Sequence, residues 1–249
     1  MISLSPEKEP LPTGSQRAGA GRRLPFNTLL VKRVFDVVAS SILLFISLPV
    51  FGLVALAVAI DSPGPIFYSQ IRVGVNRRYR ARRRDRIPVQ REQRLIERRR
   101  ILSEGRLFRI HKFRTMVVGA EDGVGPVWAL ADDPRVTRVG KWLRLLRLDE
   151  LPQFWNVLKG EMSLVGPRPE RPHFVGRFAQ RIPGYTERLR ALPGITGLAQ
   201  VERSYDACEE DVRDKLGFDL RYIEDCRLTT DVQILFKTVH VVFRRRGAR

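Results

Sequence analysis

Two adjacent carboxylates, Asp149 and Glu150, stand in the stretch LDELPQFWNVLKGEMSLVGPRPE, residues 148–170. Carboxylate oxygens are the ligands that Mg²⁺ prefers, and a carboxylate can also attack phosphorus as a covalent nucleophile. Arg168 follows between two prolines, whose fixed φ angles make its loop stiff. Its planar guanidinium can bind phosphate oxygens through two parallel hydrogen bonds. An acidic pair, a metal and cationic side chains together indicate phosphoryl transfer.

The acidic pair also has a structural interpretation. Asp149 can cap a helix over residues 150–158, because Pro152 is tolerated in a first helical turn. For an isolated Asp-Glu dipeptide, capping or surface charge is the commoner role. The surroundings favour chemistry instead, since Lys112 and Arg114 in HKFRTM add cations of the kind that bind phosphate groups.

The whole chain of 249 residues is strongly basic, with a net charge of +18 and an isoelectric point near 11.1. Such a balance indicates an anionic partner: nucleic acid, phospholipid headgroups or a phosphorylated substrate. Residues 77–104 hold 12 arginines and 4 acidic residues, which fits a solvated helix or loop, contact with anionic lipid, or nucleic-acid binding. Residues 1–25 are rich in Pro, Gly, Ser and charge, and are predicted to be a disordered tail.

Between Asp36 and Asp61 lie 24 residues without charge, enough for a helix of roughly 36 Å that would cross a bilayer. Pro49 lies in the middle, where it removes a backbone donor and kinks a helix. Both flanks are basic, and the positive-inside rule therefore places both in the cytoplasm. A helix that enters the membrane, breaks at Pro49 and returns explains both features. On these residues alone, a single kinked span is an equal alternative.

The catalytic candidates need elements that position them. Residues 66–74 and 106–116 have β-branched and aromatic residues and are predicted to pair as a hairpin. Residues 139–148 form an amphipathic helix with basic edges, which suits either a membrane interface or a core packing face. Residues 209–226 and 230–246 are predicted to be two further helices. The expected fold class is therefore α+β and mostly helical.

Six segments, in this order, carry a resemblance to a known family. The chain resembles the bacterial sugar transferases, the monotopic polyprenyl-phosphate glycosyl-1-phosphate transferases, over residues 31–245 apart from the Arg-rich segment 77–104. The matching segments are KRVFDVVAS, SPGPIFYSQIRVG, FRIHKFRTM, DDPRVTRVGKWLR, LDELPQFWNVLKGEMSLVGPRPE and LPGITGLAQV.

This resemblance implies a monotopic membrane protein. The expected organisation is a tail at 1–25, a re-entrant membrane helix at 31–60 broken at Pro49, and a small catalytic domain at 61–245 with an Arg-rich insert at 77–104. Interfacial amphipathic helices would hold the catalytic domain against membrane lipids, on the cytoplasmic face of the bacterial inner membrane. The family often has Ser directly before the proline, whereas this chain has Leu48 there and Ser47 one residue earlier.

The resemblance also implies an activity. Asp149 would attack the phosphate attached to the sugar of a UDP-sugar, releasing UMP and leaving an aspartyl phosphosugar. Polyprenyl phosphate would then take up the sugar phosphate, which starts synthesis of an exopolysaccharide, O-antigen or other glycoconjugate. Glu150 would support activation of the acceptor or the metal, Mg²⁺ would sit at Asp149, and Lys112, Arg114 and Arg168 would bind substrate phosphates.

Two other functions remain as alternatives on the sequence. One is a basic nucleic-acid-binding protein, which the 24-residue apolar run disfavours, so we expect no nucleic-acid partner. The other is a non-catalytic scaffold of a polysaccharide assembly complex. The identity of the sugar, the pathway, the role of 77–104 and a homo-oligomeric state stay open, as does whether Arg203 replaces an arginine that the family has after GITGLAQV.

Overall fold

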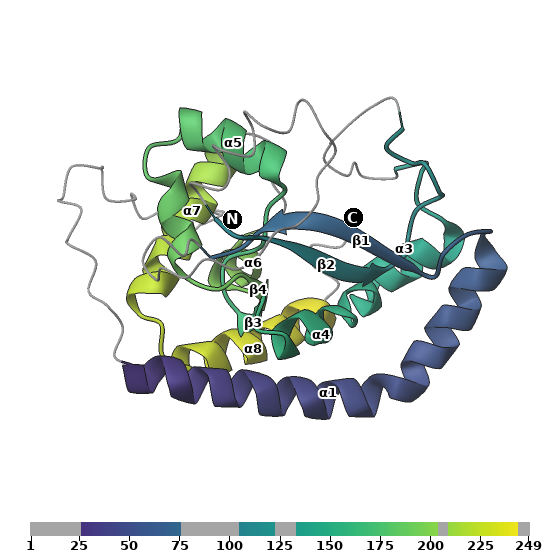
Figure 1. The fold of residues 1–249 in the computed structure, drawn as a ribbon, viewed down its shortest axis with the longest axis horizontal. Coiled ribbons are helices and arrows are strands. Elements are labelled where there is room, and N and C mark those ends of the chain that lie inside the picture. Colours follow the sequence, from purple (N-terminus) through teal and green to yellow (C-terminus); the bar gives the residue numbers. More distant parts are fainter. Residues whose placement is uncertain (1–25, 76–104, 123–132, 204–208, 244–249) are drawn as a thin grey trace, which may run out of the picture.

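A computed structural model describes residues 26–75, 105–122, 133–203 and 209–243. The predicted tail at 1–25 and the Arg-rich segment at 77–104 lie outside these residues. The described part is mostly helical with two small sheets, in agreement with the expected fold class (Figure 1).

The long apolar run forms one helix, α1 (Phe26–Asp61), which contains Pro49. The helix is not interrupted at the proline: it runs straight along the underside of the molecule and then bends upward towards β1 (Figure 1). Pro49 has no N–H to donate to the carbonyl four residues earlier, which is an established cause of such bends. Ser47 Oγ donates to the carbonyl of Leu44 at 3.0 Å, so the serine that precedes Leu48 bonds within the preceding turn.

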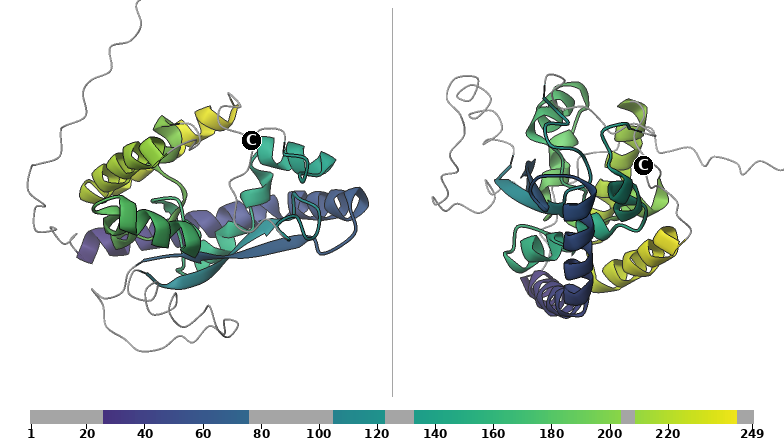
Figure 2. Two further views of the ribbon diagram at one scale, coloured as in Figure 1. Left: turned by 90° about the horizontal axis from the view of Figure 1, so that it is seen from above. Right: turned by 90° about the vertical axis from the view of Figure 1, so that its right-hand side faces the viewer.

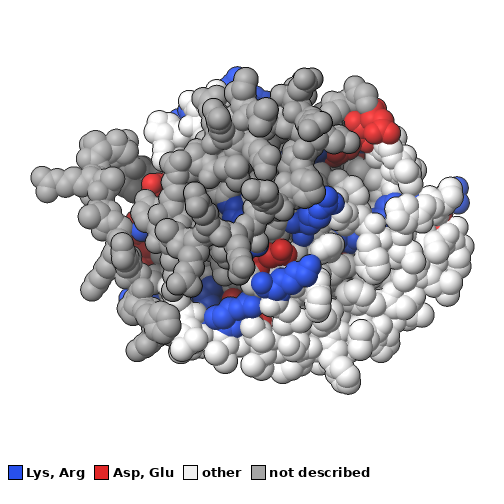
Figure 3. All heavy atoms as spheres, viewed as in Figure 1, with Lys and Arg blue, Asp and Glu red and all other residues white. Residues whose placement is uncertain are grey.

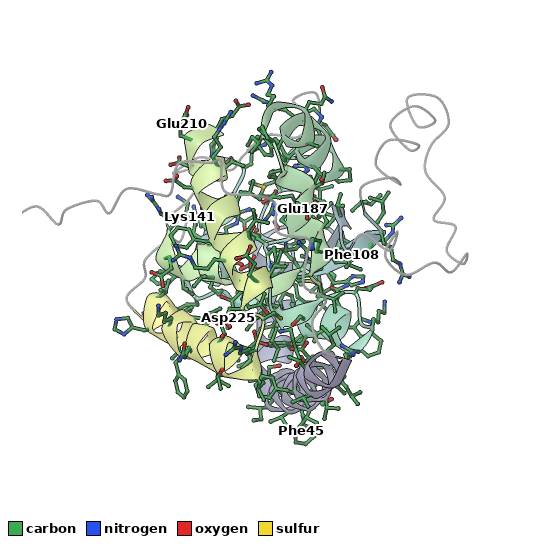
Figure 4. The ribbon with its side chains drawn as sticks, turned by 90° about the vertical axis from the view of Figure 1, so that its left-hand side faces the viewer. Phe45, Phe108, Lys141, Glu187, Glu210 and Asp225 are labelled. Atoms are coloured by element: carbon green, nitrogen blue, oxygen red, sulfur yellow. The ribbon has the colours of Figure 1, made fainter. Side chains whose placement is uncertain are left out.

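The face of α1 that packs on the protein is partly polar. Lys32, Asp36, Ser40 and Ser47 are buried along it, and Val54 continues the same face after the bend. The opposite face is apolar and exposed; Figure 4 shows Phe45 at the base, pointing away from the rest of the protein. This distribution is the reverse of a water-soluble amphipathic helix, in which the apolar face is the buried one.

Both ends of α1 are bonded to the rest of the chain. Near its start, Lys32 Nζ pairs with Asp231, and Arg33 donates to the carbonyls of Val157 at 2.6 Å and Leu158 at 2.8 Å. At its end, Asp61 Oδ2 accepts the backbone N–H of Val139 at 3.0 Å. Lys32 and Arg33, the basic residues that precede the uncharged run, are thus both held by groups of the protein.

The predicted hairpin is confirmed: β1 (Phe67–Val73) pairs antiparallel with β2 (Leu107–Phe113). The helix predicted at 139–148 is α3 (Arg138–Leu145), whose first turn Thr137 caps by accepting the N–H of Gly140 at 3.0 Å. Leu143 of α3 packs on Val54 and on Phe113 of β2. Trp142 stays 62% exposed, so α3 presents both a core face and an outward apolar residue.

The remaining elements complete the described chain. They are η2 (Leu148–Glu150), α4 (Gln153–Leu158), β3 (Ser163–Val165), α5 (Pro172–Arg181), η3 (Tyr185–Arg190), β4 (Gly194–Thr196), α6 (Leu198–Glu202), α7 (Glu209–Glu224) and α8 (Leu228–Phe243). The helices predicted at 209–226 and 230–246 correspond to α7 and α8. The second sheet is parallel, β3 with β4, and α8 lies beside α1 at the base (Figure 2).

Candidate active site

The acidic pair lies in a short 3-10 turn between two helices. Asp149 and Glu150 form η2 with Leu148, and both side chains are buried. Arg147, which precedes the turn, has a left-handed backbone with φ of 57°, the only non-glycine residue of the described part with positive φ. A left-handed residue of this kind costs on the order of 1 kcal/mol or more and reverses the chain sharply. The strained turn ends α3 and directs the two carboxylates inward.

Asp149 does not cap the helix that follows. α4 begins at Gln153 with Pro152 at its cap position, and no side chain accepts a hydrogen bond there. The structural interpretation of Asp149 as a helix cap is therefore wrong, since the chain inserts a separate turn before α4.

Strand β2 brings Lys112 to the acidic pair. Side chains alternate along a strand, so Lys112 lies on the same face of β2 as Phe108 and Ile110. These two residues pack on Val157 and Met162, which flank the loop after α4. Lys112 therefore lies near the end of the buried face of β2, next to η2.

Lys112 contacts both carboxylates. Its Nζ lies 3.2 Å from Asp149 Oδ2 and 2.9 Å from Glu150 Oε1. Arg168 NH2 lies 3.5 Å from the same Glu150 oxygen, and Arg147 NH1 lies 3.9 Å from it. Three of the chain's cations therefore converge on Glu150, and the predicted partners Lys112 and Arg168 join the acidic pair in one site.

These cations determine the charge state of Glu150. Burial raises the pKa of its carboxyl, but attraction to Lys112, Arg168 and Arg147 outweighs burial and lowers the pKa from 4.5 to about 2. Glu150 is therefore ionised throughout the physiological range.

This shift predicts a pH dependence of stability. Because the folded pKa is lower than the unfolded one, ionised Glu150 stabilises the fold fully above about pH 4.5, and the contribution is lost as the pH falls towards about 2. We expect wild type to exceed Glu150→Gln by on the order of 3 kcal/mol in free energy of unfolding at neutral pH. Unfolding of both proteins in detergent, followed from pH 7 to 2, measures the gap. If the difference in free energy of unfolding does not narrow on acidification, ionised Glu150 does not stabilise the fold in this way.

The loop with Arg168 is held tightly by backbone contacts. Gly166 N donates to Thr196 O at 2.9 Å, and Gly194 N donates to Pro167 O at 2.9 Å. A Cβ added to Gly166 would lie 2.2 Å from Leu192 O, so only glycine permits this approach of the two segments. The loop that presents Arg168 is thereby fixed to the β3–β4 sheet.

Strand β1 holds the residues that follow Arg168 in the same loop. Arg72 NH1 donates to Pro169 O at 3.1 Å, and Val73 N donates to Glu170 O at 2.9 Å. Burial, aided by the nearby charges of Arg168 and Arg171, lowers the pKa of Arg72 to about 10, although Glu170 opposes this. Several arginines are thus kept close together, which favours an anionic ligand.

A cleft of about 1120 Å³ runs past these groups. Its lining includes 11 Lys or Arg residues against 6 Asp or Glu residues, so its overall charge is positive. Figure 3 shows an uncharged region elsewhere: along the lower edge of the molecule, over α1, the surface has almost no charged side chains. The basic residues of the lining are Arg72, Lys112, Arg114, Arg135, Arg144, Arg147, Arg168, Arg171, Arg203, Lys215 and Lys237.

Arg114 lies in the lining but is committed elsewhere. Its NH1 donates to Pro63 O at 2.6 Å and its NH2 to Ser62 O at 2.6 Å, where α1 ends. The side chain therefore satisfies backbone carbonyls at and just after the C-terminal end of α1. Phosphate binding by Arg114 stays a prediction; in this structure its NH1 and NH2 groups bond to these carbonyls.

Sequence reasoning missed Arg147 as a partner of Glu150. The signal was its place directly before the turn, but nothing in the residue type reveals a left-handed backbone. Arg203, considered as a replacement for a family arginine, lies in the cleft lining and pairs with Asp214 at 2.6 Å.

The acidic pair offers a small donor set for Mg²⁺. Among the described residues, no group of three or more His, Cys, Asp or Glu side chains could enclose a metal ion. Mg²⁺ is usually held by one or two carboxylates together with substrate phosphates and water. Asp149 and Glu150, side by side in a basic cleft, fit that donor set.

Comparison with known proteins identifies relatives. The model of the family described as "Bacterial sugar transferase" matches residues 27–82 and 87–245. The chain is 40% identical over 219 residues to the UDP-N-acetylgalactosamine-undecaprenyl-phosphate N-acetylgalactosaminephosphotransferase of Aeromonas hydrophila, covering 88% of this chain and 45% of that protein. It is 37% identical over 221 residues to the UDP-glucose:undecaprenyl-phosphate glucose-1-phosphate transferase of Escherichia coli K12, covering 88% of this chain and 41% of that protein.

A shorter relative is covered more fully. The chain is 40% identical over 161 residues to the putative undecaprenyl-phosphate N-acetylgalactosaminyl 1-phosphate transferase of Bacillus subtilis, covering 65% of this chain and 74% of that protein. The chain thus spans less than half of the Aeromonas and Escherichia proteins and most of the Bacillus protein.

Proposed function

The chain belongs to the bacterial sugar transferase family, and we propose that it transfers a sugar 1-phosphate from a UDP-sugar to polyprenyl phosphate and releases UMP. The names of its relatives describe transfer of this kind to undecaprenyl phosphate. The observation that carries the proposal is the buried pair Asp149 and Glu150, contacted by Lys112 and Arg168 in a basic cleft.

The first step uses Asp149 as the nucleophile. A carboxylate oxygen attacks the sugar-bearing phosphorus of the UDP-sugar, a new O–P bond forms and the O–P bond to UMP breaks. UMP leaves with the bond's electron pair, and the sugar phosphate stays on Asp149. Lys112 and Arg168 bind and orient the diphosphate, and their charges offset those of the departing UMP.

In the second step the acceptor takes up the phosphosugar. A phosphate oxygen of polyprenyl phosphate attacks the same phosphorus, the O–P bond to Asp149 breaks, and Asp149 regains its carboxylate. The product is polyprenyl-diphosphate-sugar, a lipid-linked starting point for glycan synthesis.

The low pKa of Glu150 argues against a role as a general base. A general base works best with a pKa near the working pH, and a carboxyl with a pKa of about 2 is a poor one. We propose that Glu150 instead fixes Lys112 and Arg168 and shares the metal with Asp149. Mg²⁺ bound to these two carboxylates and to the substrate would supply charge neutralisation at the diphosphate.

The exposed face of α1 supports a membrane-embedded helix. Thr28–Asp61 is the one stretch of the described chain long and apolar enough to cross a bilayer. Both of its ends bond to one folded unit, through Arg33 at the start and Asp61 at the end. A spanning helix would separate its ends by about 30 Å of hydrocarbon. We therefore propose that α1 re-enters the cytoplasmic leaflet and leaves the catalytic part at the cytoplasmic face of the inner membrane, with exposed residues such as Trp142 and Trp155 at the interface.

Cysteine accessibility tests this arrangement. Leu29→Cys and Ile60→Cys, at exposed positions near the two ends of α1, are expected to react with a membrane-impermeant thiol reagent only from the cytoplasmic side. A matched Phe45→Cys variant, near the bend, is expected to be shielded by lipid from either side. Labelling of either end from the periplasmic side of intact cells would overturn re-entry in favour of a span.

The proposed reaction is tested by identifying the nucleotide released. The detergent-purified full chain is incubated with a panel of UDP-sugars, Mg²⁺ and undecaprenyl phosphate. We expect UMP together with a lipid-linked sugar diphosphate, and loss of both when Mg²⁺ is chelated. Release of UDP would indicate ordinary glycosyl transfer instead. No release from folded protein with any donor would favour the scaffold alternative.

A further inference from the structure

A buried ion pair lies next to the backbone of Arg168 and is separate from the contacts of Asp149 and Glu150 described above. Arg188 of η3 and Asp219 of α7 are both buried, and Arg188 Nε and NH2 lie 2.9 Å and 2.7 Å from Asp219 Oδ2. Arg188 NH1 donates to the hydroxyl of Tyr185 at 2.8 Å. The guanidinium is thus held on two sides by groups from η3 and α7.

The third contact of this guanidinium reaches the active-site loop. Arg188 NH2 donates to the backbone carbonyl of Arg168 at 3.1 Å. The Arg168 side chain itself is 37% exposed, so packing alone does not fix it, yet it lies 3.5 Å from Glu150. The buried pair of Arg188 and Asp219 is therefore linked through Arg168 to the carboxylate of Glu150 on the other side of the loop.

The loop transmits position because it has few free torsions. Pro167 and Pro169 each fix their own φ angle, and the peptide bond after Arg168 is planar. The Pro167 carbonyl accepts from Gly194 N, and the Arg168 carbonyl accepts from Arg188. The peptide groups on both sides of Arg168 are therefore held, which fixes the direction of its Cα–Cβ bond. The contact of the Arg168 carbonyl with Arg188 therefore helps to determine the direction in which the Arg168 side chain leaves the backbone.

Stability alone does not explain the pair. Burying two charges costs much of what their attraction returns, and well-packed apolar residues often replace such pairs without loss. Burial lowers the pKa of Arg188, but Tyr185 and Asp219 outweigh burial and keep the pKa above its ordinary value. Arg188 is thus a permanently charged donor held at a fixed place.

We propose that Arg188, oriented by Asp219, is a positioning residue that aims Arg168 at the phosphate site beside Glu150. Its role in turnover rests on the proposed function; its role in placing Arg168 does not. Arginine suits the task because its planar fork can bond Asp219 and the Arg168 carbonyl together, whereas the compact ammonium of lysine cannot span both.

A double-mutant cycle in the full chain tests the proposal. Arg188→Lys keeps the charge opposite Asp219, and we expect kcat/KM for phosphosugar transfer to fall on the order of 10-fold, as misplacement of a binding group does. In an Arg168→Ala background the same substitution should have no further effect, because the residue that it positions is absent. Arg181→Lys is the matched control: Arg181 pairs with Glu209 of α7 at 2.9 Å but does not contact the loop, and it should leave kcat/KM unchanged.

A second readout does not need turnover. Because the planar guanidinium of Arg168 can bind phosphate oxygens, a displaced Arg168 should weaken the binding of inorganic diphosphate, measured by isothermal titration calorimetry. We expect weaker binding, on the order of 10-fold, in Arg188→Lys, unchanged binding in Arg181→Lys, and no further loss when Arg188→Lys is added to Arg168→Ala. Equal effects of Arg188→Lys with and without Arg168, or a wild type and Arg188→Lys that do not differ in diphosphate binding, would overturn the proposal. If wild type transfers no sugar phosphate, the proposed function fails while diphosphate binding still decides this inference.

Discussion

Asp149→Asn is expected to abolish sugar-phosphate transfer, with a loss of at least about 10³-fold in kcat. The amide has nearly the shape of the carboxylate but lacks its charge and is a poor nucleophile, so no covalent bond to phosphorus can form. Because Asp149 lies in the η2 turn against Lys112, the substitution removes the attacking atom and leaves the turn in place. Release of UMP from the preferred UDP-sugar, with undecaprenyl phosphate present, measures the effect.

The control for this substitution is Asp225→Asn. Asp225 follows α7, is not among the residues that line the cleft, and pairs with Arg227 at 3.0 Å on the surface (Figure 4). It should retain wild-type activity. An Asp149→Asn protein within tenfold of wild type would contradict a nucleophilic role, and full support of glycan assembly by it in cells would favour the scaffold alternative.

Lys32→Met is expected to have the largest effect on stability. Lys32 Nζ pairs with buried Asp231 and donates to Val165 O at 3.1 Å, while Tyr222 donates to Asp231 Oδ1 at 2.8 Å. Removing the lysine leaves a buried carboxylate without its cation, which costs about 3–5 kcal/mol. Unfolding in detergent, followed by circular dichroism against denaturant, measures the loss.

Two further variants check the physical cause. Asp231→Asn in the Lys32→Met background removes the orphaned charge and should restore much of the lost stability. Val34→Met places the same residue type on the exposed face of α1 and should be nearly neutral. A Lys32→Met protein that loses less than about 1 kcal/mol would show that the pair behaves like a surface ion pair.

The local elements were predictable because their signals are local. Alternating β-branched and aromatic residues predicted the β1–β2 hairpin, and the long uncharged run predicted α1. Residue types alone grouped Lys112 and Arg168 with the acidic pair as a phosphoryl-transfer set, and the resemblance assigned their roles, although they come from segments far apart in the chain. The order of the motifs, rather than any one of them, supported the resemblance.

Features that depend on tertiary contacts were not predictable. The commitment of Arg114 to the end of α1 and the burial of Lys32 against Asp231 both pair residues with partners distant in sequence. The sequence alone does not distinguish a lysine or arginine that binds phosphate from one that binds lipid or a backbone carbonyl. The three-residue strands β3 and β4, which fix the Arg168 loop, are too short to give a periodic pattern.

The proposed mechanism depends on the covalent intermediate, and mass spectrometry of the digested protein tests for it most directly. The full chain is mixed with UDP-sugar and Mg²⁺ without polyprenyl phosphate, quenched and digested. We expect one equivalent of UMP and a phosphosugar adduct on the peptide that contains Asp149, and we expect the adduct to be lost when undecaprenyl phosphate is added before quenching. UMP formed only when the acceptor is present, with no adduct on that peptide, would contradict the account and indicate direct attack by the acceptor.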